Sequence, residues 1–135
     1  MITKEETKKT VSLVTALLLK SMRYPRKNAK RSYFIGKSSN QLEYGELLDF
    51  PPIKGNTYSI AAPSYLDVMV WLMDKRNVFV EITIDRKTRT YRWKVCDISK
   101  NADVIVDDGG FGIGDYCGCC DNAIASYCMK VLERK

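Results

Sequence analysis

Between residues 61 and 84, apolar residues first recur with the 3.6-residue period of a helix and then alternate strictly with polar residues. Pro63 suits the first turn of a helix and disfavours helical geometry at Ala62, so we expect a helix to begin near Pro63. Because apolar side chains cover more than half of its circumference, this helix is expected to be buried on most of its faces. Those side chains are Tyr65, Leu66, Val68, Met69, Val70, Leu72 and Met73.

Trp71 falls among the polar positions of the same helix. Large aromatic side chains are usually mostly buried, which favours packing under a neighbouring segment. The other interpretation is an exposed aromatic anchor, so Trp71 is also a candidate interface residue.

The period changes from 3.6 to 2 at Val78, which predicts a strand. A second alternating run at residues 91–98 follows residues 86–89, which suit a four-residue hairpin loop. Folding the hairpin about this loop places Glu81 opposite Lys94 and apolar residues opposite one another, as cross-strand energetics prefer. The predicted apolar pairs are Ile84 with Tyr91 and Ile82 with Trp93.

The chain after the hairpin predicts a third strand at residues 104–106, a glycine-rich loop and a last helix. The helical pattern lies in residues 121–135, and Asp115 or Asp121 is available to accept hydrogen bonds from the free amides at its start. The apolar face of this helix is formed by Cys120, Ala123, Ile124, Tyr127, Cys128 and Val131.

The first part of the chain opens with a predicted amphipathic helix over residues 3–22, and Pro25 follows it. Residues 33–37 and 41–47 are candidate short strands, and the turn-rich residues 49–58 are expected to be irregular. The residues expected on one face of the first helix are Val11, Val14, Leu17, Leu18 and Met22.

These elements predict an α+β protein in which a three-stranded antiparallel sheet carries helices packed on one face. Residues 1–135 form a single domain in this prediction, with a basic N-terminal helix and linker at residues 1–31. A helix-strand-strand-strand-helix core unit occupies residues 57–135. The side chains expected to be largely buried are Leu66, Val70, Met73, Val80, Ile82, Trp93, Ile124 and Val131.

The composition is that of a globular chain, since 45% of its 135 residues are hydrophobic. Five cysteines without any histidine or credible secretion signal favour free thiols in a reducing compartment, so a cytoplasmic location is expected. The apolar run at residues 11–19 is too short for a membrane span, and no small-residue cleavage site follows it.

Basic residues are concentrated near the N-terminus. Residues 1–38 hold ten Lys or Arg against two acidic residues, whereas residues 39–135 hold twelve against fourteen. A basic segment interleaved with aromatic residues suits phosphate contacts and base stacking, but a solvated helix end and linker is the simpler interpretation. The candidate nucleic-acid-binding residues are Lys20, Arg23, Arg26, Lys27, Lys30 and Arg31.

The sequence contains no complete catalytic motif. Residues 36–38 read Gly-Lys-Ser, but a phosphate-binding loop requires glycine at the position of Arg31. The glycines of residues 109–114 precede a helix, yet neighbouring aspartates would repel an anion, and the spacing of a calcium loop is missing. We therefore expect no enzymatic activity and no cofactor.

Four cysteines are candidate zinc ligands, but their spacing is not that of paired zinc knuckles. Burial in a helical core explains the inner ones without a metal, so no metal site is expected. The absence of histidine also excludes a Cys-His catalytic pair. The four residues are Cys117, Cys119, Cys120 and Cys128.

Two resemblances concern the core unit. The sequences APSYLDVMVWLMDK, VFVEITI and AIASYCMKVLE resemble a group of short uncharacterised proteins of gut Bacteroidetes and their phages. The order helix, three strands, helix is similar to the double-stranded-RNA-binding domain, in which a lysine cluster opens the last helix. In this chain, residues 117–121 contain no Lys or Arg, so the usual RNA-contacting cluster is absent.

The first resemblance implies a phage or mobile element as the context of the protein. The function predicted is a small non-catalytic accessory protein that binds another protein, with a host factor as one candidate partner. The alternative is a nucleic-acid-binding protein that uses the basic N-terminal segment, with weak affinity. No membrane partner is expected.

Overall fold

The computed structural model describes residues 10–25, 31–35, 42–46, 59–99, 101 and 103–133. The chain divides into two compact units, Met1–Ser64 and Tyr65–Lys135, and each is described by itself. A single domain over residues 1–135 stays a prediction, because two units that are each compact can still unfold together.

Helix α2 (Leu13–Ser21) of the first unit begins later than the pattern predicted. The Val11 N–H donates to the Pro63 carbonyl at 3.0 Å, and Val11 lies outside the helix. The Ser12 hydroxyl then accepts a hydrogen bond from the Thr15 N–H at 3.3 Å and caps the helix. The predicted helix is therefore not helical at residues 10–12, and residues 3–9 of its predicted range lie outside the described part of the chain.

The buried side of α2 also differs from the prediction, since Val14 and Leu17 are exposed. The predicted face assumed that Val11 is helical. Because Val11 precedes the N-cap, the side of the actual helix that is buried differs from the predicted one. The residues that α2 buries are Thr15, Ala16 and Leu19.

A small antiparallel sheet completes the first unit. Its strands are β1 (Arg31–Ile35), β2 (Leu42–Glu46) and β3 (Ser59–Ala61), in the order β2-β1-β3. The first two correspond to the predicted short strands, which are confirmed, whereas the third was not predicted. The segment expected to be irregular, residues 49–58, lies outside the described residues.

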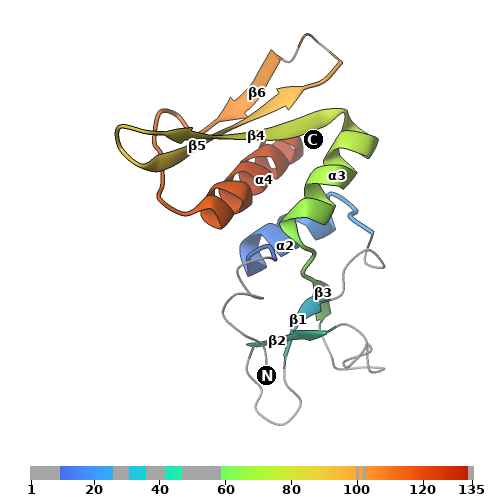
Figure 1. The fold of residues 1–135 in the computed structure, drawn as a ribbon. Coiled ribbons are helices and arrows are strands. Elements are labelled where there is room, and N and C mark those ends of the chain that lie inside the picture. Colours follow the sequence, from blue (N-terminus) through green and yellow to red (C-terminus); the bar gives the residue numbers. More distant parts are fainter. Residues whose placement is uncertain are drawn as a thin grey trace. The chain divides into compact units, whose positions relative to one another are not determined.

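The second unit contains the predicted three-stranded antiparallel sheet, in the order β4-β5-β6 (Figure 1). Its strands are β4 (Val78–Asp85), β5 (Thr90–Asp97) and β6 (Asp103–Asp107). The predicted hairpin register is confirmed: Ile84 pairs with Tyr91, Ile82 with Trp93 and Glu81 with Lys94.

A β-bulge interrupts the ladder between β5 and β6. The pairing shifts between Val95 and Cys96, so that Ile105 of β6 has no partner across the strand. The Ile105 carbonyl instead accepts a hydrogen bond from Lys130 Nζ at 2.8 Å. Lys130 of the last helix therefore supplies a hydrogen bond to the carbonyl of the residue that the bulge leaves unpaired in the ladder.

Helix α4 (Tyr116–Glu133) lies along one face of this sheet and contacts all three strands (Figure 1). It begins before residue 121 because Asp115 Oδ1 accepts a hydrogen bond from the Cys117 N–H at 3.0 Å. One of the two predicted capping aspartates is thus confirmed. The residues that α4 buries are Cys119, Cys120, Ala123, Ile124, Tyr127 and Cys128.

Helix α3 (Tyr65–Arg76) contacts β4 and α4. It buries only Val68 and Leu72, because it lies beside the edge of the sheet and meets its neighbours along one narrow face. The expectation that it is buried on most faces is wrong.

The predicted core is therefore only partly confirmed. Trp93 and Ile124 are buried, and three further members are half-buried: Val80, Ile82 and Val131. The remaining three are exposed, which contradicts the prediction: Leu66, Val70 and Met73.

Candidate functional site

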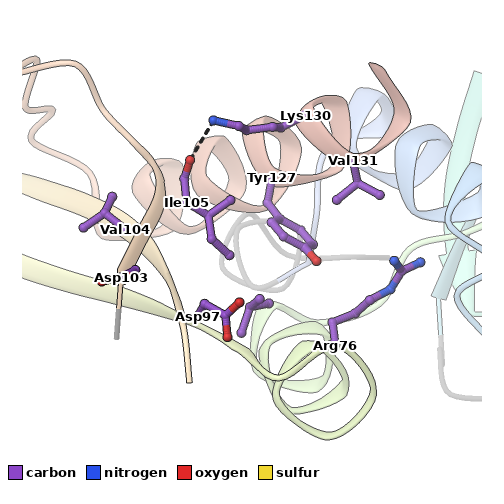
Figure 2. A pocket seen from close by; sticks show the side chains of 9 residues that line it. Arg76, Asp97, Asp103, Val104, Ile105, Tyr127, Lys130 and Val131 are labelled. Atoms are coloured by element: carbon purple, nitrogen blue, oxygen red, sulfur yellow. Dashed lines mark hydrogen bonds between the residues drawn. The ribbon is translucent and has the colours of Figure 1, made fainter. Parts of the chain in front are cut away.

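A cavity of about 390 Å³ lies in the second unit, where the C-terminal parts of α3 and α4 meet the ends of β5 and β6. Figure 2 shows side chains from these four elements around it, and Val78 at the start of β4 completes the lining. Its lining combines two cations, two carboxylates, a phenol and four aliphatic residues: Arg76, Lys130, Asp97, Asp103, Tyr127, Val78, Val104, Ile105 and Val131.

Backbone geometry at the end of α3 positions the first cation. Asn77 adopts a left-handed conformation (φ 57°), which ends the helix and turns the chain directly into β4. Arg76 is consequently the last helical residue and lies at the cavity. The second cation, Lys130, is held by its 2.8 Å hydrogen bond to the Ile105 carbonyl (Figure 2).

Tyr127 is the buried polar group of the cavity, with only 5% of its surface exposed. Burial raises the pKa of its phenol, and the positive charge of Arg76 acts in the opposite direction. The hydroxyl therefore stays protonated at neutral pH. It points towards Arg76 in Figure 2, so the two groups together present hydrogen-bond donors.

The carboxylates come from neighbouring strands, since Asp97 of β5 pairs with Asp103 of β6. A cavity that offers both charges suits polar or zwitterionic groups such as those of a peptide. Its nine lining residues include no Cys, Ser, Thr or His, so they provide no nucleophile paired with a base.

The exposed apolar surface of α3 is a second candidate site. Leu66, Val70 and Met73 are 67%, 47% and 47% exposed and form what we call the α3 stripe. Their spacing of four and then three residues places them on one side of the helix, opposite the buried Val68 and Leu72.

Acidic residues flank the α3 stripe on one side. Asp67 and Asp74 are both exposed and lie seven residues apart, so they occupy the same line along the helix. Trp71, the predicted candidate interface residue, lies beyond this line and is partly buried.

Asp108 is the most strongly held carboxylate of the second unit, but its role is structural. It accepts hydrogen bonds from Arg92 Nε at 2.7 Å and Nη2 at 2.9 Å, and from the N–H groups of Trp93 and Gly110. These contacts, led by the one to Arg92, lower its pKa to about 2. Its side chain is only 3% exposed, so it is not available to a ligand.

All five cysteines are free thiols. Burial raises the pKa of Cys120 to about 11 and that of Cys128 to about 12, which disfavours the thiolates that bind metals. Within the described ranges, no three His, Cys, Asp or Glu residues gather in a way that could hold a metal ion. The structure therefore does not bring the four candidate zinc ligands together as a set.

The candidate nucleic-acid-binding residues are only partly described. Lys20 and Arg23, at the end of α2, are exposed. Arg31 lies in β1, where the structure describes only its backbone. The other three, Arg26, Lys27 and Lys30, lie outside the described residues.

Sequence reasoning missed the cavity. The sequence pattern indicates only basic residues near helix ends for Arg76 and Lys130, and it predicts a core position for Tyr127. The available signal was Asn77, which combined with the strand at Val78 predicts a tight helix-to-strand turn. The bulge at Ile105, a residue that lines the cavity, has no such sequence signal.

Comparison of the chain with family models, curated proteins and solved structures finds no match. Among the helices of the described ranges, none has both the length and the apolar character needed to cross a bilayer.

Proposed function

We propose that this protein is a small non-catalytic accessory protein of a phage or mobile element and acts by binding another protein, for example a host factor, through the α3 stripe. The observation that carries the proposal is the exposure of Leu66, Val70 and Met73 on one side of a helix. The resemblance of residues 57–135 to phage-associated proteins supports the biological context.

Energetics favour a partner for this surface. Full burial of a Leu, Val or Met side chain is worth about 1.5 to 3 kcal/mol, so covering the three half-exposed residues would contribute roughly 3 kcal/mol. Single exposed apolar residues are common on proteins, but three in one line are typical of interaction surfaces.

The partner surface that fits best is an amphipathic helix with a basic flank. Residues spaced four and three apart match the apolar seam of a second helix packed alongside. Asp67 and Asp74 border the α3 stripe and would attract Lys or Arg residues at the edge of that seam. Charge complementarity therefore selects a basic helix over a neutral or acidic one.

Affinity capture with a mutated α3 stripe tests the proposal. The full chain and a triple variant, L66S/V70S/M73S, are each used as bait in lysate of the host, and bound proteins are quantified by mass spectrometry. A matched control, I84S/I98S/F111S, replaces three residues that are also exposed but lie elsewhere on the second unit and outside the cavity.

We expect at least one protein to be retained by the wild type and the control but reduced about tenfold or more by the stripe variant. Reconstitution with that purified protein, and with a peptide of its basic helix, then measures Kd directly. Equal capture by all three baits, with equal denaturation midpoints, would contradict the proposal.

Nucleic-acid binding through the basic N-terminal segment is the second candidate, and the exposure of Lys20 and Arg23 favours it. Six phosphate contacts would give a slope of roughly −4 to −5 in a plot of log affinity against log salt. Replacing Arg26, Lys27 and Lys30 by alanine should then reduce its magnitude by about 2 to 3.

Fluorescence anisotropy with labelled single-stranded and duplex RNA and DNA measures this slope. The matched control, K75A/K87A/R89A, removes three exposed basic residues of the second unit. We expect binding to be weak and sequence-independent. Tight binding at physiological salt that only the N-terminal variant abolishes would make nucleic acid the principal partner.

A further inference from the structure

Two cysteines occupy adjacent turns at the start of α4. Cys117 and Cys120 are separated by Gly118 and Cys119, within the helix Tyr116–Glu133. Three residues along an α-helix separate Cα atoms by about 5 Å, a distance that follows from its rise and radius. Disulfides join Cα atoms about 4.4 to 6.8 Å apart, so the helix holds this pair within bonding range.

The two thiols differ in accessibility in the way that thiol–disulfide exchange requires. Cys117 is partly exposed, whereas Cys120 has no exposed surface. Burial is the main cause of the raised pKa of Cys120, and the charge of Cys117 is the second cause, as expected for neighbouring sulfurs. Cys117 can therefore meet a solution disulfide, whereas the buried Cys120 cannot meet one directly.

The other cysteines of α4 are directed elsewhere. Cys119 Sγ donates to the Tyr91 carbonyl at 3.4 Å, so it points into the sheet. Cys128 lies eight residues beyond Cys120, about 12 Å along the helix. Neither competes with Cys120 for a bond to Cys117.

The first turn of α4 is preorganised by Asp115. Its carboxylate accepts from the Cys117 N–H at 3.0 Å, and its carbonyl accepts from the Cys119 N–H at 3.0 Å. The backbone between the two cysteines is thus fixed before any sulfur–sulfur bond forms, which lowers the entropic cost of closing the ring.

We propose that Cys117 and Cys120 form a reversible thiol–disulfide site whose substrates are small disulfides of the glutathione type. The Cys117 thiolate attacks one sulfur of the substrate, forms a mixed disulfide and releases the other half as a thiolate. As Cys120 attacks Cys117 Sγ, its proton passes to the departing thiolate, so the second half leaves as a thiol and a Cys117–Cys120 disulfide remains. Two protein thiols are oxidised, and one substrate disulfide is reduced to two thiols.

This site is independent of the α3 stripe and goes beyond the proposed binding function. A pair of cysteines three residues apart is a redox motif in proteins of reducing compartments, where structural disulfides are rare.

The test treats the full-length protein with oxidised glutathione under anaerobic conditions, followed by alkylation of the remaining thiols. We expect two of the five thiols to become protected, and fragment-ion mass spectrometry to place the bond between Cys117 and Cys120. Excess reduced glutathione should restore all five. Because this localisation uses the wild type, it does not depend on a variant that folds.

Serine variants assign the roles. C120S should retain glutathione on Cys117, C117S should protect no thiol pair, and the matched control C119S should still form the disulfide. The proposal is overturned if the wild type keeps five alkylatable thiols, if it stops at a glutathione adduct, or if the bond joins any other pair.

Discussion

Helices α3 and α4 belong to the same unit and are comparably rich in apolar residues, yet they pack differently. Helix α4 lies across all three strands of the sheet and buries six residues, from Cys119 to Cys128. Helix α3 contacts β4 and α4 and buries only Val68 and Leu72. Three of its other apolar side chains, the α3 stripe, face outwards.

This contrast shows that the apolar content of a helix does not measure its burial. Small residues such as Ala123 and three buried cysteines let α4 approach the sheet closely along a broad face. Helix α3 carries large apolar residues on two opposite sides, and one side suffices for packing. The other side of α3 is available for binding, which is why we propose binding through α3, whereas the buried face of α4 stabilises the fold.

Truncation of the α4 core should have the largest effect. Ile124 has no exposed surface, so Ile124→Ala removes buried methylene groups and leaves a cavity. We expect the free energy of unfolding to fall by about 2 to 5 kcal/mol, measured by urea denaturation. A loss below about 1 kcal/mol would contradict the central position of α4.

Acid should destabilise the loop that leads into α4. The folded-state pKa of Asp108, about 2, lies below its ordinary value of 3.8, so the ionised carboxylate stabilises the fold fully above pH 4. This contribution, about 2 kcal/mol after allowance for the exposure of Arg92, is lost as the pH falls towards 2.

The matched variant Asp108→Asn removes the charge and should be less stable at neutral pH by a similar amount. Its stability curve should converge with that of the wild type at acid pH. Parallel curves between pH 5 and 2.5, measured by chemical denaturation, would show that Asp108 is not the group responsible.

Truncation of the α3 stripe should barely change stability. Leu66 is 67% exposed, so Leu66→Ala should alter the free energy of unfolding by no more than about 0.5 kcal/mol. Denaturation measured beside Ile124→Ala gives the comparison directly. A loss of 2 kcal/mol or more would mean that this face of α3 belongs to the core.

Metal removal should have the smallest effect. Because burial accounts for Cys120 and Cys128, we expect unchanged thermal midpoints after treatment with a strong chelator. Elemental analysis of the purified protein gives an independent measurement. Stoichiometric zinc, together with unfolding by the chelator, would instead make the α4 cysteines a structural metal site.

The sequence predicted the strands of the second unit well because their signals are local. Alternation from Val78 onwards and a four-residue loop determine the register, including the pair Glu81–Lys94. The apolar face of α4 was likewise predicted from its period, from Ala123 to Cys128.

The remaining features depend on tertiary contacts that no local pattern encodes. The side of α3 that is buried depends on where the edge of the sheet lies. The start of α2 depends on the bond between Val11 and Pro63, which are far apart in sequence. The cavity likewise needs Arg76, Tyr127 and Lys130 from two helices to converge.

The bulge at Ile105 has a further consequence for how this sheet behaves at high concentration. Strand β6 lies at one edge of the sheet, where a regular row of backbone groups would template the strand of another molecule. The bulge breaks that row, Lys130 occupies the Ile105 carbonyl, and Asp103 and Asp107 place negative charge at both ends. Growth of an intermolecular sheet from this edge is therefore disfavoured, which protects the protein against aggregation through β6.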